Sequence, residues 1–374
     1  MKIDFLKAVD RLIGFLLTSF LPTVMVRPIS IPRSIIIIRP GGIGDAVLLA
    51  NHVRSLKHFY PYCHITVLAE RRNSGVFPLI TCVDDVLCYD RPRDLFRAIN
   101  GCYDVVIDTE QWYRLSAVVA RLIKSPIKIG FDTNNRRRMF THGINYDKLA
   151  FEPESFLSLL EPLGIYSQVN IETAVLSVPP QSASLVNQLL QPLNAGSFIA
   201  IFPGASIPEK RWGADRFRRV AEMLSAFGIK IVVVGGKEDR QQGEIIAAGG
   251  LCLNLAGLTS LPETAAILQK SSLLLSGDSG VLHIAVGLGI PTVSLFGPGR
   301  ANKWAPRGDR HLVINKKLPC SPCTTFGNTP RCPINAKCMS DITVDEVVNA
   351  VTMLLTSVGT MPSQCCKRDW IEMA

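Results

Sequence analysis

The sequence predicts an α/β protein built from two doubly wound domains, and three observations lead to this expectation. From Ser34 onward, apolar runs rich in β-branched residues alternate with helix-like stretches. The runs are continuous instead of alternating with polar residues, which is typical of parallel strands covered by helices on both faces. The chain has 374 residues, of which 47% are hydrophobic and 19% charged. Such a chain is long enough for two domains with a core each, and disorder is not expected.

The predicted elements fall into two similar halves. In the first half the runs predict strands at 35–39, 64–69, 85–89, 104–108 and 128–131, with helices near 46–58 and 113–124. In the second half they predict strands at 198–202, 230–234, 252–255, 273–276 and 292–296, with helices near 214–227, 239–248, 261–269 and 281–287. We therefore expect a Rossmann-like domain over 34–177, a linker over 178–197, a second Rossmann-like domain over 198–342, and a C-terminal helix and tail over 343–374.

The first 33 residues read as a separate amphipathic segment. Apolar residues follow helical spacing between positions 5 and 21, with Lys7, Arg11 and Thr18 on the other side. The uncharged stretch 12–26 is too short to span a bilayer easily, Pro22 interrupts it, and no small-residue cleavage site follows. We expect a helix lying in the plane of a membrane surface, the alternative being a helix packed on the protein's own surface. Deleting residues 1–26 should then release the protein from membranes without abolishing soluble activity.

The formal net charge of +9 indicates an anionic partner. Nucleic acid, anionic lipid and phosphorylated substrates all qualify on charge alone. The basic residues are scattered, apart from Arg136, Arg137 and Arg138, and no nucleic-acid-binding motif accompanies them. We therefore expect no nucleic acid among the partners.

The segment SGDSGVLH at 276–283 lies between an apolar run and a helix-like stretch. The backbone N–H groups and the dipole at such a helix N-terminus favour a phosphate or another anion. The carboxylate of Asp278 would repel a phosphate, so it fits better against hydroxyl groups, as on a sugar bound beside a diphosphate. His283 could belong to this site or could be a core histidine with its hydrogen bonds satisfied.

A glycine-rich turn follows the first predicted strand, in the sequence IIIIRPGGIGD. Gly42 and Gly44 allow a close backbone approach to a ligand, and Asp45 falls at or near the N-cap of the next helix. On local sequence alone, Asp45 could simply cap that helix.

Two loops after strands of the second half could also contact a ligand. The loop FPGASIPEKRW carries Ser206 and Lys210, whose cation could reach a diphosphate or could be a solvated surface charge. The loop VGGKED carries Glu238, which could accept hydrogen bonds from ribose hydroxyls or could cap a helix. Ligands of doubly wound sheets bind beyond the carboxyl ends of the strands, so a cleft between the two domains is the expected site.

The ordered motifs IIIIRPGGIGD, FPGASIPEKRW, VVVGGKED, LNLAGLTSLPETAAIL and LLLSGDSGVLHIAVGLGIPTVSLFGP resemble glycosyltransferase family 9, the heptosyltransferases of lipopolysaccharide core synthesis. The resemblance covers about residues 35–351. It implies the GT-B fold and an inverting, metal-independent transfer of heptose from an ADP-heptose donor to a phosphorylated glycolipid acceptor. It also implies a cytoplasmic protein, peripheral on the inner face of the bacterial inner membrane.

The resemblance assigns roles to individual residues. Asp45 matches the proposed general base, and Lys210 matches the lysine that neutralises charge on the departing ADP. Glu238 would hold the ribose and Asp278 would contact sugar hydroxyls. Backbone N–H groups at the start of the helix would hold the diphosphate, and adenine would lie near residues 256–258. The remaining substrate-binding candidates in the matching motifs are Gly42, Gly44, Ser206, Ser279, Gly280, Val281 and His283.

Two alternatives to heptose transfer stay open. One is a glycosyltransferase of the same family that uses another nucleotide sugar or a protein acceptor. The other, from a different class, is a nucleotide-binding module or sugar epimerase without transferase activity.

Nine of the eleven cysteines form two populations, and Cys365 and Cys366 lie in the C-terminal tail. Five occur singly inside apolar runs, as reduced buried thiols do, and favour a reducing compartment: Cys63, Cys82, Cys88, Cys102 and Cys252. Four others cluster in the Pro-containing loop 319–339: Cys320, Cys323, Cys332 and Cys338. These four could form a tetrahedral thiolate site for structural zinc or iron, or could be free thiols packed in a loop. Similar clusters occur in members of the resembled family, including relatives that modify bacterial autotransporters.

Overall fold

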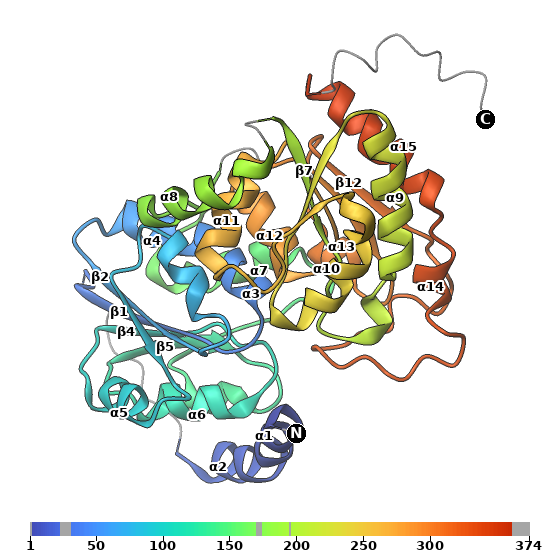
Figure 1. Cartoon of the computed structure of the whole chain (residues 1–374). Coiled ribbons are helices and arrows are strands. Elements are labelled where there is room, and N and C mark those ends of the chain that lie inside the picture. Colours follow the sequence, from blue (N-terminus) through green and yellow to red (C-terminus); the bar gives the residue numbers. More distant parts are fainter. Residues whose placement is uncertain (1, 23–30, 170–173, 194–195, 361–374) are drawn as a thin grey trace. The chain divides into compact units, whose positions relative to one another are not determined.

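The computed structural model describes residues 2–22, 31–169, 174–193 and 196–360. The chain divides into two compact units, the first ending at Asn170 and the second beginning at Ile171. Each unit is built around one six-stranded sheet (Figure 1). The prediction of two doubly wound α/β domains is confirmed.

The sheet of unit 1 has the strand order β3-β2-β1-β4-β5-β6, and all of its strands are parallel. This is the order of a nucleotide-binding doubly wound sheet. The strands are β1 (Ser34–Arg39), β2 (His64–Ala69), β3 (Asp85–Cys88), β4 (Val105–Asp108), β5 (Ile127–Phe131) and β6 (His142–Ile144). The helices beside it are α3 (Ile43–Leu48), α4 (Ala50–Phe59), α5 (Pro92–Asn100), α6 (Arg114–Leu122) and α7 (Glu152–Ser158).

Two features of unit 1 differ from the expectation. The stretch predicted as one helix over 46–58 is two helices, α3 and α4, which meet at Leu49. Strand β6 was not predicted, because its three residues, HGI, carry no apolar run and lie at the edge of the sheet. The four isoleucines of β1 are buried, as expected for the central strand of a sheet covered on both faces.

The sheet of unit 2 repeats the same topology, with the order β12-β11-β10-β7-β8-β9 and parallel pairing throughout. Its strands are β7 (Phe198–Phe202), β8 (Lys230–Val233), β9 (Leu253–Asn254), β10 (Leu273–Gly277), β11 (Thr292–Phe296) and β12 (His311–Asn315). Its helices are α8 (Pro180–Leu189), α9 (Ala214–Ala226), α10 (Arg240–Ile246), α11 (Leu261–Lys270), α12 (Gly280–Gly287), α13 (Ala301–Trp304), α14 (Lys337–Ser340) and α15 (Val344–Ser357). Edge strand β12 was not predicted.

The C-terminal helix α15 completes the core of unit 2. Thr343 forms its N-cap by accepting a hydrogen bond from the Glu346 N–H (3.2 Å), and Glu346 accepts one from the Thr343 N–H (2.8 Å). Val347, Val351 and Leu354 of α15 pack into the same apolar cluster as α9 and strands β7, β8, β10 and β11. The helix is therefore part of the second fold rather than an appended tail.

The N-terminal segment is helical and packs beside α6 in unit 1 (Figure 1). It comprises α1 (Lys2–Val9), a π-helical turn η1 (Asp10–Gly14) and α2 (Phe15–Phe20). Within the described parts of the chain, no helix is both long and apolar enough to cross a membrane.

Candidate active site

The glycine turn after β1 places Asp45 in the first turn of α3. Gly41 has φ +102°, a conformation that L side chains rarely adopt, and Gly42 is the N-cap. Asp45 Oδ2 lies 3.4 Å from the position a Cβ would take at Gly42 and 3.7 Å from that at Gly41, so the carboxylate folds back over the turn. The positive end of the helix dipole stabilises a carboxylate there. Gly44 lies inside α3, one residue before Asp45.

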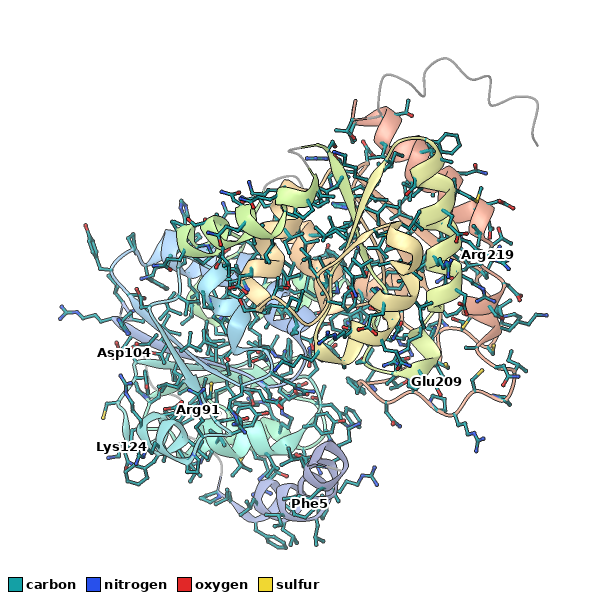
Figure 2. The ribbon with its side chains drawn as sticks, in the orientation of Figure 1. Phe5, Arg91, Asp104, Lys124, Glu209 and Arg219 are labelled. Carbon is teal, nitrogen blue, oxygen red and sulfur yellow. The ribbon has the colours of Figure 1, made fainter. Side chains whose placement is uncertain are left out.

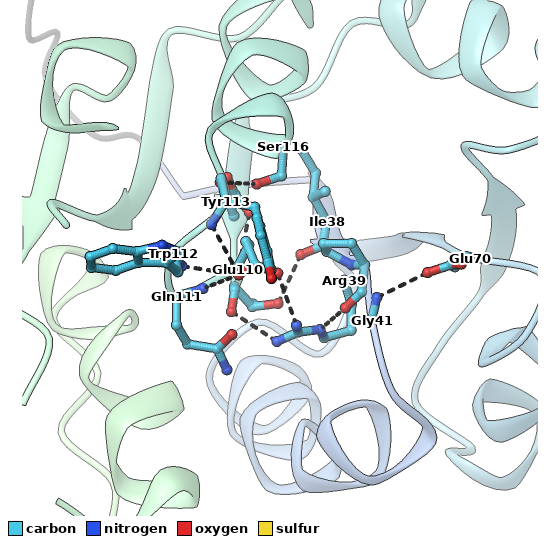
Figure 3. A network of polar contacts seen from close by, with 12 residues as sticks. Ile38, Arg39, Gly41, Glu70, Glu110, Gln111, Trp112, Tyr113 and Ser116 are labelled. Atoms are coloured by element: carbon cyan, nitrogen blue, oxygen red, sulfur yellow. Dashed lines mark hydrogen bonds and ion pairs between the residues drawn. The ribbon is translucent and has the colours of Figure 1, made fainter. Parts of the chain in front are cut away.

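The buried ion pair of Arg39 and Glu110 lies next to this turn (Figure 3). Arg39, at the end of β1, is 1% exposed and stands 3.5 Å from Glu110 Oε2. Its Nε donates to the Pro40 carbonyl (2.6 Å) and its Nη1 to the Thr109 carbonyl (2.9 Å). A Cβ at Gly41 would be 3.3 Å from Arg39 Nη2. The guanidinium group therefore joins the turn that leads to Asp45 to the loop after β4.

A second polar cluster lies at the same carboxyl edge of the sheet. Arg136 and Asp108 are fully buried and form an ion pair of 2.6 Å. Burial raises the pKa of the Asp108 carboxyl, and Arg136 opposes that rise. The Tyr146 hydroxyl donates to Glu152 Oε2 (2.8 Å). Burial first, and then Glu152, raise the pKa of Tyr146, with a smaller contribution from Asp45.

Sequence reasoning did not single out these supporting residues. Arg39, Asp108 and Glu110 each stand at or just after the end of an apolar strand, the position where ligand-edge residues of such sheets occur. That signal was present in the sequence for these three residues, although in the first half it was applied only to the glycine-rich turn of Asp45.

In unit 2, a buried tryptophan fixes the loop that carries Lys210. Trp212 is 3% exposed, donates from Nε1 to the Ile342 carbonyl (3.0 Å), and meets the Phe217 ring edge-on at 5.0 Å. Lys210 ends the short 3₁₀ turn two residues earlier, and its side chain is 16% exposed. Ser206 is exposed in the same loop. The lysine is thus held on an anchored loop instead of a solvated one.

The structure brings Lys210 and Asp278 together. Lys210 Nζ is 2.6 Å from Asp278 Oδ2, and the carboxylate side chain is 11% exposed. The next residue, Ser279, is the N-cap of α12 and accepts a hydrogen bond from the Leu282 N–H at 3.2 Å. The N–H groups of Gly280 and Val281 belong to the first turn of α12, where they have no partner within the helix. A cation, a carboxylate and a helix N-terminus therefore meet at the carboxyl end of β10.

The absence of a side chain at Gly299 leaves room for the Asp278 carboxylate. A Cβ at Gly299 would lie 2.1 Å from Asp278 Oδ2, a separation that real Cβ atoms do not reach. Gly299 belongs to the GPG turn after β11. The carboxylate thus occupies space that only glycine leaves open. His283 is buried on α12, 5% exposed, and lies four residues beyond the cap.

The loop after β8 carries two neighbouring carboxylates, Glu238 and Asp239, in different surroundings. Asp239 is buried and accepts a hydrogen bond from the Gly236 N–H at 2.9 Å, so it is the structural cap, and burial raises its pKa. Glu238 is exposed on the same turn. The Gly257 N–H donates to the Gly235 carbonyl (2.9 Å), which places the loop expected near adenine against the loop that carries Glu238.

The four clustered cysteines line one pocket. Cys320, Cys323, Cys332 and Cys338 share its wall with Pro298 and Glu209, the neighbour of Lys210. Burial, and then the proximity of the other thiols, raise the pKa of Cys323 and of Cys338. No group of three or more His, Cys, Asp or Glu side chains in the described residues is arranged to hold a metal ion.

The solitary cysteines only partly follow the expectation of buried thiols. Cys63 and Cys88 are buried, Cys82 and Cys252 are half-buried, and Cys102 is exposed. Burial raises the pKa of Cys63 to about 11 and that of Cys252 to about 12. Cys102 lies before β4 and forms an isolated β-bridge with Lys124 outside the named strands.

Two doubly wound sheets of equal topology, one of which carries a lysine–aspartate pair at a helix N-terminus, fit the GT-B class of glycosyltransferases. A sequence model of glycosyltransferase family 9 (heptosyltransferase) matches residues 93–332. The chain belongs to this family.

Individual relatives agree with this assignment. The lipopolysaccharide heptosyltransferase 3 of Escherichia coli is 29% identical over 289 residues, which cover 70% of this chain and 83% of that protein. A family 9 glycosyltransferase structure from Veillonella parvula matches with a TM-score of 0.74 and 21% identity, covering 87% of this chain and 97% of that one. The E. coli heptosyltransferase WaaC, solved with ADP-2-deoxy-2-fluoro heptose, matches with a TM-score of 0.67 and 18% identity, covering 86% and 99%. These solved structures share the fold.

Proposed function

We propose that this protein transfers heptose from ADP-heptose to a phosphorylated glycolipid acceptor of the lipopolysaccharide core, with inversion at the anomeric carbon and without a catalytic metal. The observation that carries the proposal is the pair of Lys210 and Asp278 at the N-terminus of α12, in a chain of the heptosyltransferase family. A diphosphate needs N–H donors and a cation, whereas a sugar needs a carboxylate for its hydroxyls.

In this proposal unit 2 binds the donor. The N–H groups of Gly280 and Val281 hold the diphosphate together with the helix dipole. When the donor binds, Lys210 exchanges Asp278 for the diphosphate, so that its cation is already in place when negative charge builds on the departing ADP. Asp278 then accepts hydrogen bonds from sugar hydroxyls, and the exposed Glu238 accepts from the ribose.

The acceptor hydroxyl attacks the anomeric carbon while Asp45 removes its proton. The bond that breaks joins that carbon to the β-phosphate oxygen of ADP, so ADP leaves with the electron pair. Arg39 and the glycine turn fix the position of Asp45, which such a base requires.

The test is a transfer assay with purified protein, ADP-heptose and de-acylated core oligosaccharide, followed by ADP release and product mass. Asp45→Asn should lower kcat by about 10²- to 10⁴-fold. Asp85→Asn is the matched control, because Asp85 is a partly exposed carboxylate at the start of edge strand β3 of the same sheet. Equal rates for Asp45→Asn and the parent would show that Asp45 is not the base. Transfer only from another nucleotide sugar, or only to a protein, would replace the proposed substrates.

We also propose that the cysteine loop takes up a structural zinc or iron ion. Four thiols that line one pocket supply the donor set of a closed tetrahedral site, and the loop would have to draw them together around the ion. Cys320→Ser should lower the metal content of protein expressed with added metal, whereas Cys102→Ser, the matched control at an exposed cysteine outside the loop, should not. Less than roughly 0.2 equivalents of zinc and iron in the parent protein would refute the proposal.

We further propose that the protein works on the inner face of the inner membrane, in contact with lipid through its N-terminal helix. The glycolipid acceptor is a membrane component, and the net charge of +9 suits an anionic surface. Co-sedimentation with anionic vesicles tests this location.

A further inference from the structure

The N-terminal helix, residues 2–20, is attached to unit 1 by its polar side. Asp10 and Thr18 are buried, at 4% and 0% exposure, and face the body with Gly14, one turn apart. A Cβ at Gly14 would lie 3.0 Å from Arg114 Cβ, so glycine is what permits this close approach to α6. A surface helix of a globular protein usually buries its apolar stripe. The N-terminal helix instead buries the stripe of Asp10, Gly14 and Thr18.

The apolar side of this helix therefore faces outward. Phe5 and Leu12 are each 67% exposed and Phe20 is 80% exposed, and Figure 2 shows Phe5 on the outer side of the helix. Further exposed apolar residues on the same helix are Leu6, Ile13, Phe15 and Leu16. Lys7 is half-buried and Arg11 is exposed on the same helix. Long cationic side chains can reach lipid phosphates while the apolar side of a helix enters the bilayer. A bilayer containing anionic lipid fits this combination of charge and apolar surface.

Asp10 is the attachment point of the helix. Its Oδ1 accepts hydrogen bonds from the Arg114 N–H (2.6 Å) and the Leu115 N–H (2.8 Å) at the start of α6. Its Oδ2 is 3.8 Å from the Arg114 guanidinium group. The carboxylate thus satisfies orphan donors of a helix N-terminus and interacts favourably with its dipole. Burial raises the pKa of Asp10, while these two backbone hydrogen bonds oppose the rise.

Glu110 binds the backbone just before the N-terminus of α6 (Figure 3). Glu110 Oε1 accepts from the N–H groups of Gln111 (3.0 Å), Trp112 (3.0 Å) and Tyr113 (3.3 Å). Two carboxylates therefore occupy five consecutive N–H groups, 111–115. Through its other oxygen Glu110 meets Arg39, the residue under the glycine turn of Asp45.

We propose that Asp10 is a positioning residue that joins the bilayer-docking helix to the loop 110–113, and through Glu110 and Arg39 to the turn that carries Asp45. The membrane contact and the acceptor-side turn then behave as one rigid body, and docking restrains the turn. The effect of Asp10 on heptose transfer rests on the proposed function. Its effect on the rigidity of the turn that carries Asp45 does not. It also replaces the expectation that residues 1–26 can be removed without effect on soluble activity.

The first test measures amide hydrogen exchange in the segments 39–46 and 110–117. Asp10→Ala removes the acceptor for two N–H groups and should speed exchange in both segments about tenfold, with no change in unit 2. Asp10→Asn keeps a side-chain carbonyl that can accept both hydrogen bonds and should restore most of the protection. In steady-state assays with a de-acylated acceptor, Asp10→Ala should lower kcat about tenfold and leave the KM for the donor within about twofold, because donor groups lie in unit 2.

The second test separates lipid contact from positioning. The double variant Leu12→Ser and Phe20→Ser removes exposed apolar groups and should abolish flotation with vesicles containing phosphatidylglycerol, while exchange in 39–46 matches the parent. If this variant floats with such vesicles as the parent does, the exposed apolar side of the helix does not bind the bilayer and the proposal is refuted. A requirement for a partner protein in vesicle binding would refute it as well.

Parent-like exchange of Asp10→Ala in 39–46 would refute the positioning role. If Asp10→Ala does not fold, the parent protein is tested instead. Adding phosphatidylglycerol vesicles should slow amide exchange in 110–117 and 39–46, and unchanged exchange rates would overturn the proposal. If the parent transfers no heptose, the proposed function fails, whereas exchange and flotation still give their own answer here.

Discussion

Gly299→Ala should impair donor use through a single steric contact. The alanine methyl would lie 2.1 Å from Asp278 Oδ2, whereas real Cβ contacts stay above 3.0 Å. The carboxylate oxygen must therefore move by about 1 Å, and it now stands 2.6 Å from Lys210 Nζ. A misplacement of about 1 Å in a binding constellation costs up to about 100-fold in rate, or about 2.7 kcal/mol. Gly299 has no positive φ, so its backbone accepts alanine without strain.

The assay is the initial rate of ADP release against ADP-heptose concentration, with a thermal melt to show that the fold is unchanged. Gly277→Ala is the matched control, because its nearest new contact is an ordinary 3.5 Å. In Asp278→Ala the nearest remaining atom is Cβ, 3.8 Å from the new methyl group, so adding Gly299→Ala should change the rate by less than about twofold. Independent, additive losses in the double variant would refute the reasoning.

Three further outcomes are expected. Lys210→Met should lower kcat about 10²- to 10³-fold, and an unchanged kcat would contradict its role at the leaving group. Burial lowers the pKa of His52 from 6.5 to about 4, so only the unfolded chain gains the proton as pH falls from 7 to 5. Between pH 7 and pH 5 the free energy of unfolding of the parent, measured in urea, should therefore fall by about 2 kcal/mol more than that of His52→Gln. Equal decreases in the two proteins would argue against a neutral buried His52. Gly130→Ala places a Cβ 2.3 Å from Phe140 Cζ in the core and should cost about 1–3 kcal/mol, read as a lower Tm; an unchanged Tm would contradict this packing.

The sequence alone predicted the central strands because burial on both faces leaves a strong signal. The run of isoleucines in β1 and the runs in β7 and β11 appear where they were expected. Of the four edge strands, β3 and β9 were predicted from their apolar residues, whereas β6 and β12 were missed. The residues of β6 and most of those of β12 are half-buried, so both strands give a weaker signal than the fully buried central strands.

The candidate site was predictable where a residue acts next to its own strand. Lys210 and Asp278 follow β7 and β10, so strand order brings them to one edge. Arg39 and Glu110 lie 71 residues apart, and no local pattern pairs them. The same applies to Asp10 and Arg114: the sequence showed an amphipathic helix but not which side binds the protein, because the partner of its carboxylate is a backbone end 104 residues away.

The position of α15 has a consequence for the order in which the chain folds during synthesis. Every strand of unit 1 lies before residue 145, so that sheet can form while unit 2 is still being translated. Unit 2 instead draws Val347, Val351 and Leu354 into its core from the last helix. Its apolar cluster stays open until residue 357 leaves the ribosome, and a chain truncated before Val344 would expose that cluster to aggregation.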